Sequence, residues 1–424
     1  KLVVLVRPKR FEVSFDQIPL NQQVTPRNPV SNLATVAISG IENSGGFDRA
    51  TVRIYRDGVP YGSELQQDLT YSDQTASFLL EPEIPAELAS YTFEVFLIAG
   101  EDRFLVKQVT DVVAGDVFLW YGQSNAEGIA FSGSSDAYLS PWIRTYGMSS
   151  DSASATQAYP FWVEADGDGS RDVPAGVGQW ALVVGKQIVD DYGIPVAILN
   201  GARAGYSMPQ LQRDDANPDN LADGGGVTRP YNRLRYRAIQ AHVADKARAI
   251  FFFQGESDAN DAAQHATGFA SLVEDWQTDY PSIERIFVSQ VHVGCGQNLV
   301  ARDLPELRNL QRLFADVYGN VRVMSTNGLL THTDNCHFPF TGGQETHGLN
   351  SFRQAARELY GAPDLPATDP PNPARVEIAN QTADRLRIVL RDADAGITVD
   401  PTALVDFRLS GSSAIPISAS VTSD

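Results

Sequence analysis

Residues 115–128 read Gly-Asp-Val-Phe-Leu-Trp-Tyr-Gly-Gln-Ser-Asn-Ala-Glu-Gly, and the fold is predicted outward from this stretch. The run 117–121 is apolar and β-favouring without alternation, which predicts a strand buried on both faces, as at the centre of a parallel sheet. The polar turn 122–125 follows, at the end of the strand, where open α/β sheets handle ligands. A serine on such a turn exposes its hydroxyl and can have backbone N–H groups aimed at the same point, as acyl transfer requires. A capping role for this turn is the alternative.

The length and composition of the chain limit its class. At 424 residues it is too long for one ordinary core, so two or three domains are expected. A content of 43% hydrophobic and 20% charged residues indicates a globular protein. Asp and Glu number 52 against 33 Lys and Arg, and the net charge of −19 argues against nucleic acid or an anionic membrane as the main partner. No stretch approaches the roughly 18 consecutive apolar residues of a membrane span.

Residues 1–113 alternate in short β-like runs. Turn signals at 43–46 and 57–60 separate these runs at the spacing of an all-β sandwich. We therefore predict an N-terminal β-sandwich accessory domain that either packs against its neighbour or binds carbohydrate. The chain does not begin with Met, which is typical of a processed or trimmed product.

Residues 114–362 alternate between strands and helices. Apolar strands are predicted near 116–121, 195–199, 248–253, 285–291 and 320–325, with helices over 177–192, 234–246, 265–280, 304–318 and 349–360. This pattern predicts an α/β domain with a doubly wound, parallel, five-stranded sheet in the flavodoxin-like order 2-1-3-4-5.

The end of the chain changes composition again. Residues 363–375 contain five prolines, which is typical of a stiff linker. Residues 376–424 return to short alternating runs and predict a C-terminal β segment. This segment either completes the N-terminal sandwich or belongs to a β-sandwich domain that continues beyond Asp424.

Four groups of residues with chemical potential follow successive strands. They are Ser124, the small-residue loop 200–207, the run 254–258 and the run 334–338. Because a doubly wound fold brings these strand ends to one rim, a serine, a glycine amide, an amide side chain and a histidine are expected to converge.

Three of these groups resemble a known family. Gly-Gln-Ser-Asn at 122–125, Gln-Gly-Glu-Ser at 254–257 and Asp-x-x-His at 334–337 are similar to the motifs of the SGNH hydrolase superfamily. The match is to the branch that contains sialate O-acetylesterases and carbohydrate acetylesterases such as acetylxylan esterases, and it covers roughly 115–361. The resemblance implies a serine esterase that removes O-acetyl groups from carbohydrate and needs neither metal nor organic cofactor.

The resemblance also implies a role for each matching residue. Ser124 would be the nucleophile and His337 the general base, which later returns the proton to the leaving alcohol. Asp334 would hold the imidazole by its other nitrogen. The oxyanion hole would consist of the backbone N–H groups of Ser124 and Gly205 and the side-chain amide of Gln254.

Other residues of the motifs are predicted to contact substrate or to order the loops. These are Gln123, Asn125, Tyr206 and Glu256. Tyr206 stands where the branch usually has a small residue, so we expect it to narrow the pocket or stack on a sugar ring. Glu256 is expected to order its loop through hydrogen bonds rather than to act as a catalytic acid.

The remaining histidines give alternatives to His337. His332 and His347 compete for the role of base, but His347 lacks an aspartate three residues before it. His242 and His265 lie in helix-like segments and are predicted to be surface residues. His292 lies near Cys295, yet no spacing of His, Cys and carboxylates supports a metal site, so none is predicted.

The two cysteines, Cys295 and Cys336, follow the fourth and fifth predicted strands. These strand ends are neighbours in the order 2-1-3-4-5, so a disulfide is geometrically plausible, and two unpaired thiols are the alternative. A disulfide favours an exported protein, so we expect a secreted or periplasmic, bacterial location.

Several features leave alternatives for the function. The stretch 131–176 is long, irregular and rich in aromatic residues, which either stack on sugar or form local core. The expected substrate is acetylated xylan, sialic acid or a related glycan, with the sugar, the position and the oligomeric state open. The rival functions are an esterase for another short acyl group and a non-catalytic carbohydrate-binding protein on an SGNH scaffold.

Overall fold

The structure is a computed structural model that describes residues 11–169, 171–223, 228–292, 303–364, 368–391 and 415–421. The chain divides into two compact units, Lys1–Tyr360 and Gly361–Asp424. The larger unit contains both the N-terminal strands and the alternating strands and helices, and the candidate site lies within it.

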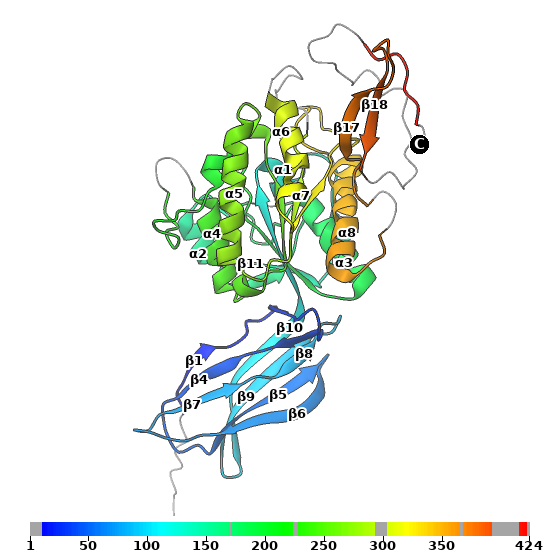
Figure 1. The fold of residues 1–424 in the computed structure, drawn as a ribbon. Coiled ribbons are helices and arrows are strands. Elements are labelled where there is room, and N and C mark those ends of the chain that lie inside the picture. The colour runs from blue at the N-terminus through cyan, green and yellow to red at the C-terminus, as the bar shows by residue number, and fades with distance from the viewer. Residues whose placement is uncertain are drawn as a thin grey trace, which may run out of the picture. The chain divides into compact units, whose positions relative to one another are not determined.

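The N-terminal part of the larger unit consists of strands (Figure 1). Their bounds are β1 Val13–Gln17, β2 Val24–Pro26, β3 Leu33–Thr35, β4 Ile38–Glu42, β5 Arg49–Arg56, β6 Val59–Asp68, β7 Ala76–Leu80, β8 Glu83–Pro85 and β9 Tyr91–Ala99. Strands β1, β4 and β7 form one antiparallel sheet, β3 pairs with β8, and β5 lies between β6 and β9. Alternate residues of β4 and β7 are buried, because one face of this sheet packs on a core. The role of this part as an accessory sandwich stays a prediction.

Strand β10, Asp102–Gly122, is 21 residues long and runs through both parts of the larger unit. Its first half pairs antiparallel with β9, and its second half is parallel to β13, Val196–Asn200, and β14, Ala249–Phe253. Residues 117–121 have no exposed surface, as their unalternating apolar run predicted. The boundary predicted at 113/114 therefore falls inside a strand, and the four-part division of the chain stays a prediction.

The α/β part is built on strands in the order β12-β11-β13-β10-β14-β15-β16. The further bounds are β11 Ile143–Tyr146, β12 Trp162–Glu164, β15 Arg285–Ser289 and β16 Val321–Met324. From β13 to β16 the strands are parallel and, numbered along the chain, lie in the order 2-1-3-4-5. The α/β class is confirmed, but five strands were too few, because β11 and β12 extend the sheet beyond β13.

The two additional strands come from the stretch 131–176, which was expected to be irregular. Strand β11 carries Arg144 and Thr145 at its centre, although all four of its residues are buried. The Arg144 guanidinium is accommodated because it donates to the Asp111 carboxylate at 2.8 Å and to the Pro141 carbonyl at 3.0 Å. A buried arginine interrupts the apolar run that indicates a central strand, so the sequence pattern concealed this one.

Helices cover both faces of the α/β sheet (Figure 1). Helix α3 packs against α8, and α5 packs against α6. The helices and helical turns are α1 Ser124–Glu127, η1 Asp136–Tyr138, α2 Ala153–Ala158, α3 Gln179–Tyr192, η2 Met208–Leu211, α4 Pro230–Gln240, η3 Ala244–Lys246, η4 Glu256–Asp258, α5 Ala262–Asp279, α6 Asp303–Arg312, α7 Phe314–Val317, η5 Phe340–Gln344 and α8 Glu345–Tyr360.

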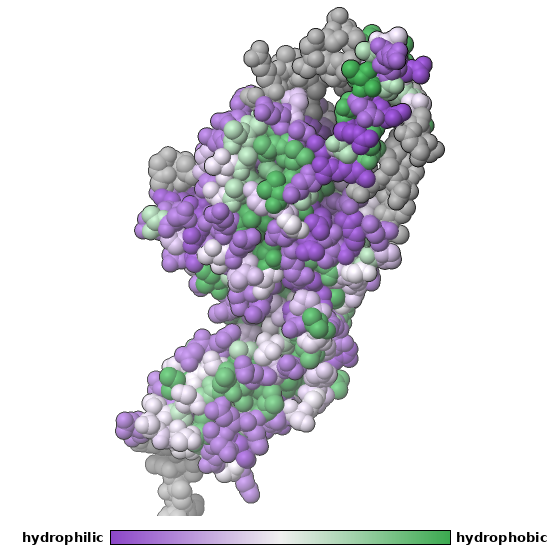
Figure 2. Space-filling model, in the orientation of Figure 1, coloured by the Kyte–Doolittle hydropathy of each residue, from purple (hydrophilic) through white to green (hydrophobic). Residues whose placement is uncertain are grey.

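Polar residues cover most of the face of the larger unit seen in Figure 2, and apolar residues form scattered groups among them. Within the described ranges, no helix combines the length and the apolar character needed to cross a membrane.

Asp116 ties the base of β10 to three other elements. Its side chain is fully buried and accepts two hydrogen bonds from Arg27, each at 2.9 Å. It also accepts one from Arg248 at 2.9 Å and one from the Tyr360 hydroxyl at 2.6 Å. Both arginine side chains are almost fully buried, and Asp116 is the carboxylate that they share, while Arg248 also pairs with Glu284 at 2.6 Å.

We expect Asp116→Asn to lower the free energy of unfolding by about 3–5 kcal/mol, because it leaves two buried guanidinium groups without their common carboxylate. Urea denaturation at neutral pH measures this change. Asp190→Asn is the control, since Asp190 forms an exposed pair with Lys186 and its loss should cost less than about 1 kcal/mol. Equal effects of the two substitutions would show that the Asp116 network does not stabilise the fold.

The smaller unit contains a two-stranded antiparallel hairpin. Its strands are β17, Pro373–Ile378, and β18, Leu386–Leu390. β structure is therefore present in 376–391, the part of the predicted β segment that this hairpin covers, and β17 begins inside the stretch 363–375 predicted as a linker. The place of the segment in a sandwich stays a prediction.

Candidate active site

Ser124 begins the short helix α1 directly after the turn that ends β10. The turn depends on Gly122, whose φ is +132° and whose added Cβ would meet the Phe253 carbonyl oxygen at 2.0 Å. Only glycine fits this combination of positive φ and close backbone approach. The chain therefore leaves the strand at Gly122 and places Ser124 at the carboxyl end of the central strand, as the sequence predicted.

His337 and Ser124 lie far apart in sequence but share a hydrogen bond. The distance from His337 Nε2 to Ser124 Oγ is 2.9 Å, and His337 Nδ1 lies 2.6 Å from Asp334 Oδ2. The other Asp334 oxygen accepts the backbone N–H groups of Cys336 and His337 at 3.0 and 3.1 Å. The loop therefore folds around the Asp334 carboxylate and fixes the direction of the imidazole.

The charge of Asp334 is favoured by the same contacts. Burial alone would raise the pKa of this carboxyl, but the hydrogen bonds from the His337 side chain and from the backbone of His337 and Cys336 outweigh it and lower the pKa to about 2. Asp334 is thus an anion at neutral pH, next to the imidazole nitrogen that does not face Ser124.

Phe131 supports the imidazole from one side. Its ring stacks on His337 with centroids 4.1 Å apart and an interplanar angle of 10°. Nothing in the sequence pattern distinguishes Phe131 from the other aromatic residues of 131–176.

Glu127 connects the Ser124 turn to the loop that contains Gly205. Its buried carboxylate accepts the Ala204 backbone N–H at 2.6 Å and a hydrogen bond from Arg171 at 3.0 Å. Burial raises the pKa of Glu127, and Arg171 and the Ala204 N–H act against this rise. Sequence reasoning missed this residue, although its position three residues after Ser124 keeps it on the same helical turn.

The backbone N–H groups of Ser124 and Gly205 are available as donors. Among the residues that the structure describes, neither has a hydrogen-bond acceptor. Gly205 has a φ of +74° and open space where a Cβ would lie, so this loop presents backbone rather than a side chain. The availability of both groups fits the oxyanion donors expected from the sequence.

Gln254 is placed differently from the expectation. Its side chain has no exposed surface, and its Nε2 donates to the Tyr206 carbonyl at 2.9 Å and to Asp258 Oδ2 at 2.8 Å. Both amide hydrogens are therefore used inside the protein. The expectation that Gln254 donates to the oxyanion is therefore corrected. Its amide instead joins the loop 200–207 to the run 254–258.

Asp258 and His265 belong to the same buried network. Asp258 accepts the Met208 backbone N–H at 2.7 Å and lies 2.9 Å from His265 Nδ1. His265 was expected at the surface but is fully buried, because its partners Asp258 and Gln311 satisfy both ring nitrogens.

The other motif residues order the loops. Gln123 Oε1 accepts the Ser257 backbone N–H at 3.0 Å, and Asn125 Nδ2 donates to Glu256 and to the Cys336 carbonyl. Burial raises the pKa of Glu256, and the hydrogen bond from Asn125 acts against this rise. These contacts join the turn 122–125, the run 254–258 and the run 334–338.

Tyr206 is largely buried. The residue is 8% exposed and belongs to the main core, and its hydroxyl lies 3.1 Å from Thr228 Oγ1. The expectation that it stacks on a sugar ring is therefore wrong, since the ring has too little free surface.

The rival histidines lie in other surroundings. His347 is buried and lies 2.8 Å from Ser289 Oγ, and burial lowers its pKa to about 3. His332 Nδ1 lies 3.8 Å from Asp334 Oδ1, but His332 and Ser124, both described, share no hydrogen bond. His337 is therefore the histidine that the structure brings to Ser124.

Two further expectations concern cysteines and metals. Cys295 lies outside the described residues, so its disulfide with Cys336 stays a prediction. Within the described ranges, no group of three or more His, Cys, Asp and Glu side chains is arranged to hold a metal ion.

A match to one solved structure supports this fold, and a second match is weaker. A carbohydrate acetylesterase from Xanthomonas citri matches with a TM-score of 0.57 and 17% identity, over 87% of this chain and 79% of that chain. A protein from Arabidopsis thaliana matches over 55% of this chain and 94% of that chain, at 19% identity and a TM-score of 0.42. No curated protein sequence matches the chain.

The sequence also matches a family model. Residues 114–356, more than half of the chain, match the model described as "Carbohydrate esterase, sialic acid-specific acetylesterase". This range contains Ser124, Asp334 and His337, the three side chains joined by hydrogen bonds. The chain belongs to this carbohydrate esterase family and is a carboxylic ester hydrolase.

Proposed function

We propose that this protein is a serine esterase that removes O-acetyl groups from carbohydrate through an acyl-enzyme on Ser124. The observation that carries the proposal is the pair of hydrogen bonds from Ser124 Oγ to His337 Nε2, at 2.9 Å, and from His337 Nδ1 to Asp334, at 2.6 Å. Such a chain of contacts activates a hydroxyl that is a weak nucleophile on its own.

In the first half of the proposed reaction, Ser124 Oγ attacks the acetyl carbonyl carbon while His337 Nε2 takes its proton. The backbone N–H groups of Ser124 and Gly205 donate to the oxygen that becomes negative. His337 then gives the proton to the sugar oxygen as the ester C–O bond breaks, and the sugar alcohol leaves. Asp334 stays ionised and stabilises the imidazolium.

In the second half, His337 takes a proton from water, whose oxygen attacks the acyl carbon. The bond from the acyl carbon to Ser124 Oγ then breaks, the serine regains its proton from His337, and acetate is released. No step of this scheme needs an organic cofactor or a metal.

The proposed substrate is an acetylated glycan such as xylan or an O-acetylated sialic acid. The family to which the chain belongs and the polar loops around Ser124 support a carbohydrate ester. We also propose a secreted or periplasmic location in a bacterium, which rests on the predicted disulfide and the acidic composition.

The first test is release of acetate from acetylated xylan, O-acetyl sialic acid and a small aryl acetate. We expect hydrolysis by the intact protein and a loss of at least about 10⁴-fold in kcat for Ser124→Ala. Thr156→Val, in helix α2, is the control and should keep full activity. If the intact protein releases acetate from none of the three substrates, the proposed acetyl specificity is wrong. Hydrolysis of another short acyl ester would then identify the protein as an esterase for that acyl group.

Glu127 is expected to position the loop 200–207, whose Gly205 backbone N–H is a proposed oxyanion donor. Glu127→Ala removes the acceptor of the Ala204 N–H, so kcat should fall by about 10–100-fold with little change in KM, because a displaced donor weakens transition-state binding. Glu127→Gln keeps an oxygen acceptor and should lose less than about tenfold. Steady-state kinetics on the aryl acetate measure both. Equal losses in the two variants would mean that the carboxylate charge, rather than the hydrogen bond to Ala204, matters.

A further inference from the structure

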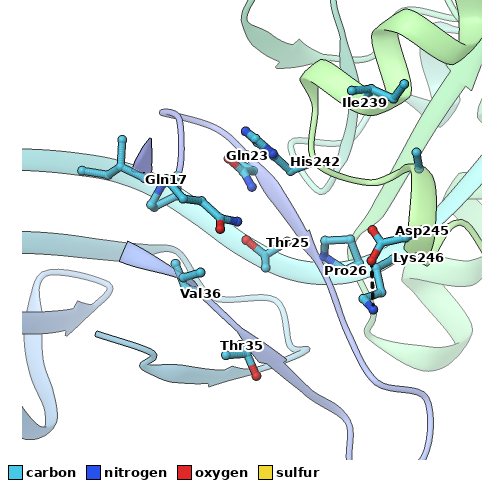
Figure 3. A pocket seen from close by; sticks show the side chains of 14 residues that line it. Gln17, Gln23, Thr25, Pro26, Thr35, Val36, Ile239, His242, Asp245 and Lys246 are labelled. Atoms are coloured by element: carbon cyan, nitrogen blue, oxygen red, sulfur yellow. Dashed lines mark ion pairs between the residues drawn. The ribbon is translucent and has the colours of Figure 1, made fainter. Parts of the chain in front are cut away.

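A pocket of about 360 Å³ lies where the N-terminal strands meet the end of α4 and η3 (Figure 3). Gln17, Thr25 and Thr35 come from the strand side, and Ile239 and His242 come from the helix side. Its volume falls in the range of roughly 300–1,000 Å³ that is typical of small-ligand sites.

This pocket is separate from the site around Ser124. Pro26, on its wall, pairs with Gly115 near the middle of β10. Ser124 lies beyond the far end of that strand. The seven residue-to-residue steps from 115 to 122 span about 23 Å at about 3.3 Å per step, so a molecule in this pocket does not reach the nucleophile.

The pocket wall contains a buried hydroxyl without a protein partner. Thr25 is only 7% exposed, and its Oγ1 has no hydrogen-bond partner among the described residues. In Figure 3 this hydroxyl is on the side of Thr25 that faces Gln17 and Gln23. An unpaired buried hydroxyl costs free energy. The polar group of a ligand would remove that cost once the Thr25 side chain rotates to turn its buried oxygen into the pocket.

Gln23 adds a second polar group of the same kind. It is 6% exposed, and its Oε1 accepts the Leu20 backbone N–H at 2.8 Å. This contact fixes the orientation of the amide, whose N–H groups have no acceptor among the residues that the structure describes. A fixed donor beside the Thr25 hydroxyl can therefore bind a ligand oxygen without first losing side-chain freedom.

The charge and shape of the pocket favour a neutral sugar. Asp245 and Lys246, the acidic and basic residues among its described lining, pair with each other at 3.1 Å and so compensate each other. Pro26, Val36 and Ile239 provide apolar surface beside the amides and hydroxyls. A pyranose ring presents the same combination, hydroxyl groups around C–H faces.

We propose that this pocket binds a neutral sugar unit of a polysaccharide chain, without taking part in ester hydrolysis. The chain belongs to a carbohydrate esterase family, and the choice of a polysaccharide rests on the proposed function, in which the substrate is an acetylated glycan. A second contact on the same polymer would raise the local concentration of ester groups at Ser124.

The test uses the Ser124→Ala protein and three unacetylated probes, xylohexaose, cellohexaose and mannohexaose, in calorimetric titrations. We expect saturable binding of at least one probe. Ala37→Phe, which fills the pocket, should abolish this binding, and Thr25→Val should weaken it by about 2–10-fold, the effect of one hydrogen bond. Thr156→Val is the matched control, since Thr156 is also buried with an unpartnered hydroxyl, but in helix α2. It should leave the affinity unchanged.

Three results would overturn the proposal: no binding of any probe, unchanged affinity in Ala37→Phe, or unchanged affinity in Thr25→Val. Full hydrolysis of the aryl acetate by Ala37→Phe with Ser124 restored would establish that the filled variant folds. Should it fail to fold, Thr25→Val still decides, because it removes no protein hydrogen bond. The probes contain no ester, so their failure to bind leaves the proposed hydrolysis intact, and a failure of hydrolysis leaves the binding test intact.

Discussion

His337→Ala is expected to lower kcat for acetyl ester hydrolysis by about 10⁴–10⁶-fold, and adding Ser124→Ala to it is expected to cause little further loss. The physical reason is that the serine hydroxyl and the imidazole act as one unit through their 2.9 Å hydrogen bond. Without the base the hydroxyl keeps its proton, and without the hydroxyl the base has no nucleophile to activate. Kinetics of the aryl acetate with the two single variants and the double variant measure the coupling.

The control for this cycle is His332→Ala. His332 lies on the same loop, 3.8 Å from Asp334, yet shares no hydrogen bond with Ser124, so its loss should change kcat by less than about tenfold. If the losses of His337→Ala and Ser124→Ala instead multiplied in the double variant, the two side chains would act independently and the proposed mechanism would fail.

Asp334→Asn is expected to lower kcat by about 10⁴-fold at neutral pH. An asparagine amide facing His337 Nδ1 with its N–H group favours the tautomer that carries the proton on Nε2, which cannot accept the proton of Ser124. It also removes the anion that stabilises the imidazolium. The pH dependence of kcat/KM for the aryl acetate, with Asp190→Asn as a charge-matched control, measures the effect.

The same carboxyl gives a stability prediction with a definite sign. Its pKa falls from 3.8 to about 2 on folding, so the carboxylate stabilises the folded state above pH 3.8, and this contribution is lost as the pH falls toward 2. Parent and Asp334→Asn should therefore differ more in unfolding free energy at pH 6 than at pH 2.5. The difference should be modest, because the side chain is 40% exposed and solvent screens it. A difference that grew toward low pH would contradict the lowered pKa.

The parts of the site that the sequence predicted lie on short motifs at strand ends. Ser124 follows an unmistakable buried strand, and Asp334 and His337 stand three residues apart, so one loop is enough to bring them into contact. The convergence of distant motifs followed from the parallel sheet, whose strand ends share one rim.

The parts that could not be predicted depend on side-chain partners. Gln254 matches a motif, but its amide satisfies the Tyr206 carbonyl and Asp258, which only the packed structure reveals. His265 stands in an amphipathic pattern, yet hydrogen bonds to Asp258 and Gln311 compensate its ring nitrogens for the loss of water on burial. Glu127 accepts the Ala204 N–H and Phe131 stacks on His337, and neither contact produces a periodic pattern in the sequence.

The unbroken course of β10 has a consequence for how this protein can evolve. Modules are usually exchanged at exposed linkers, where few contacts are lost. Residues 1–113 have no such linker before Ser124, because the strand that leaves their sheet is also the central strand of the catalytic one. Recombination at this point would cut a buried strand and separate Arg27 from Asp116. The N-terminal strands are therefore expected to be inherited together with the catalytic part, and module exchange is expected instead at the proline-rich stretch 363–375.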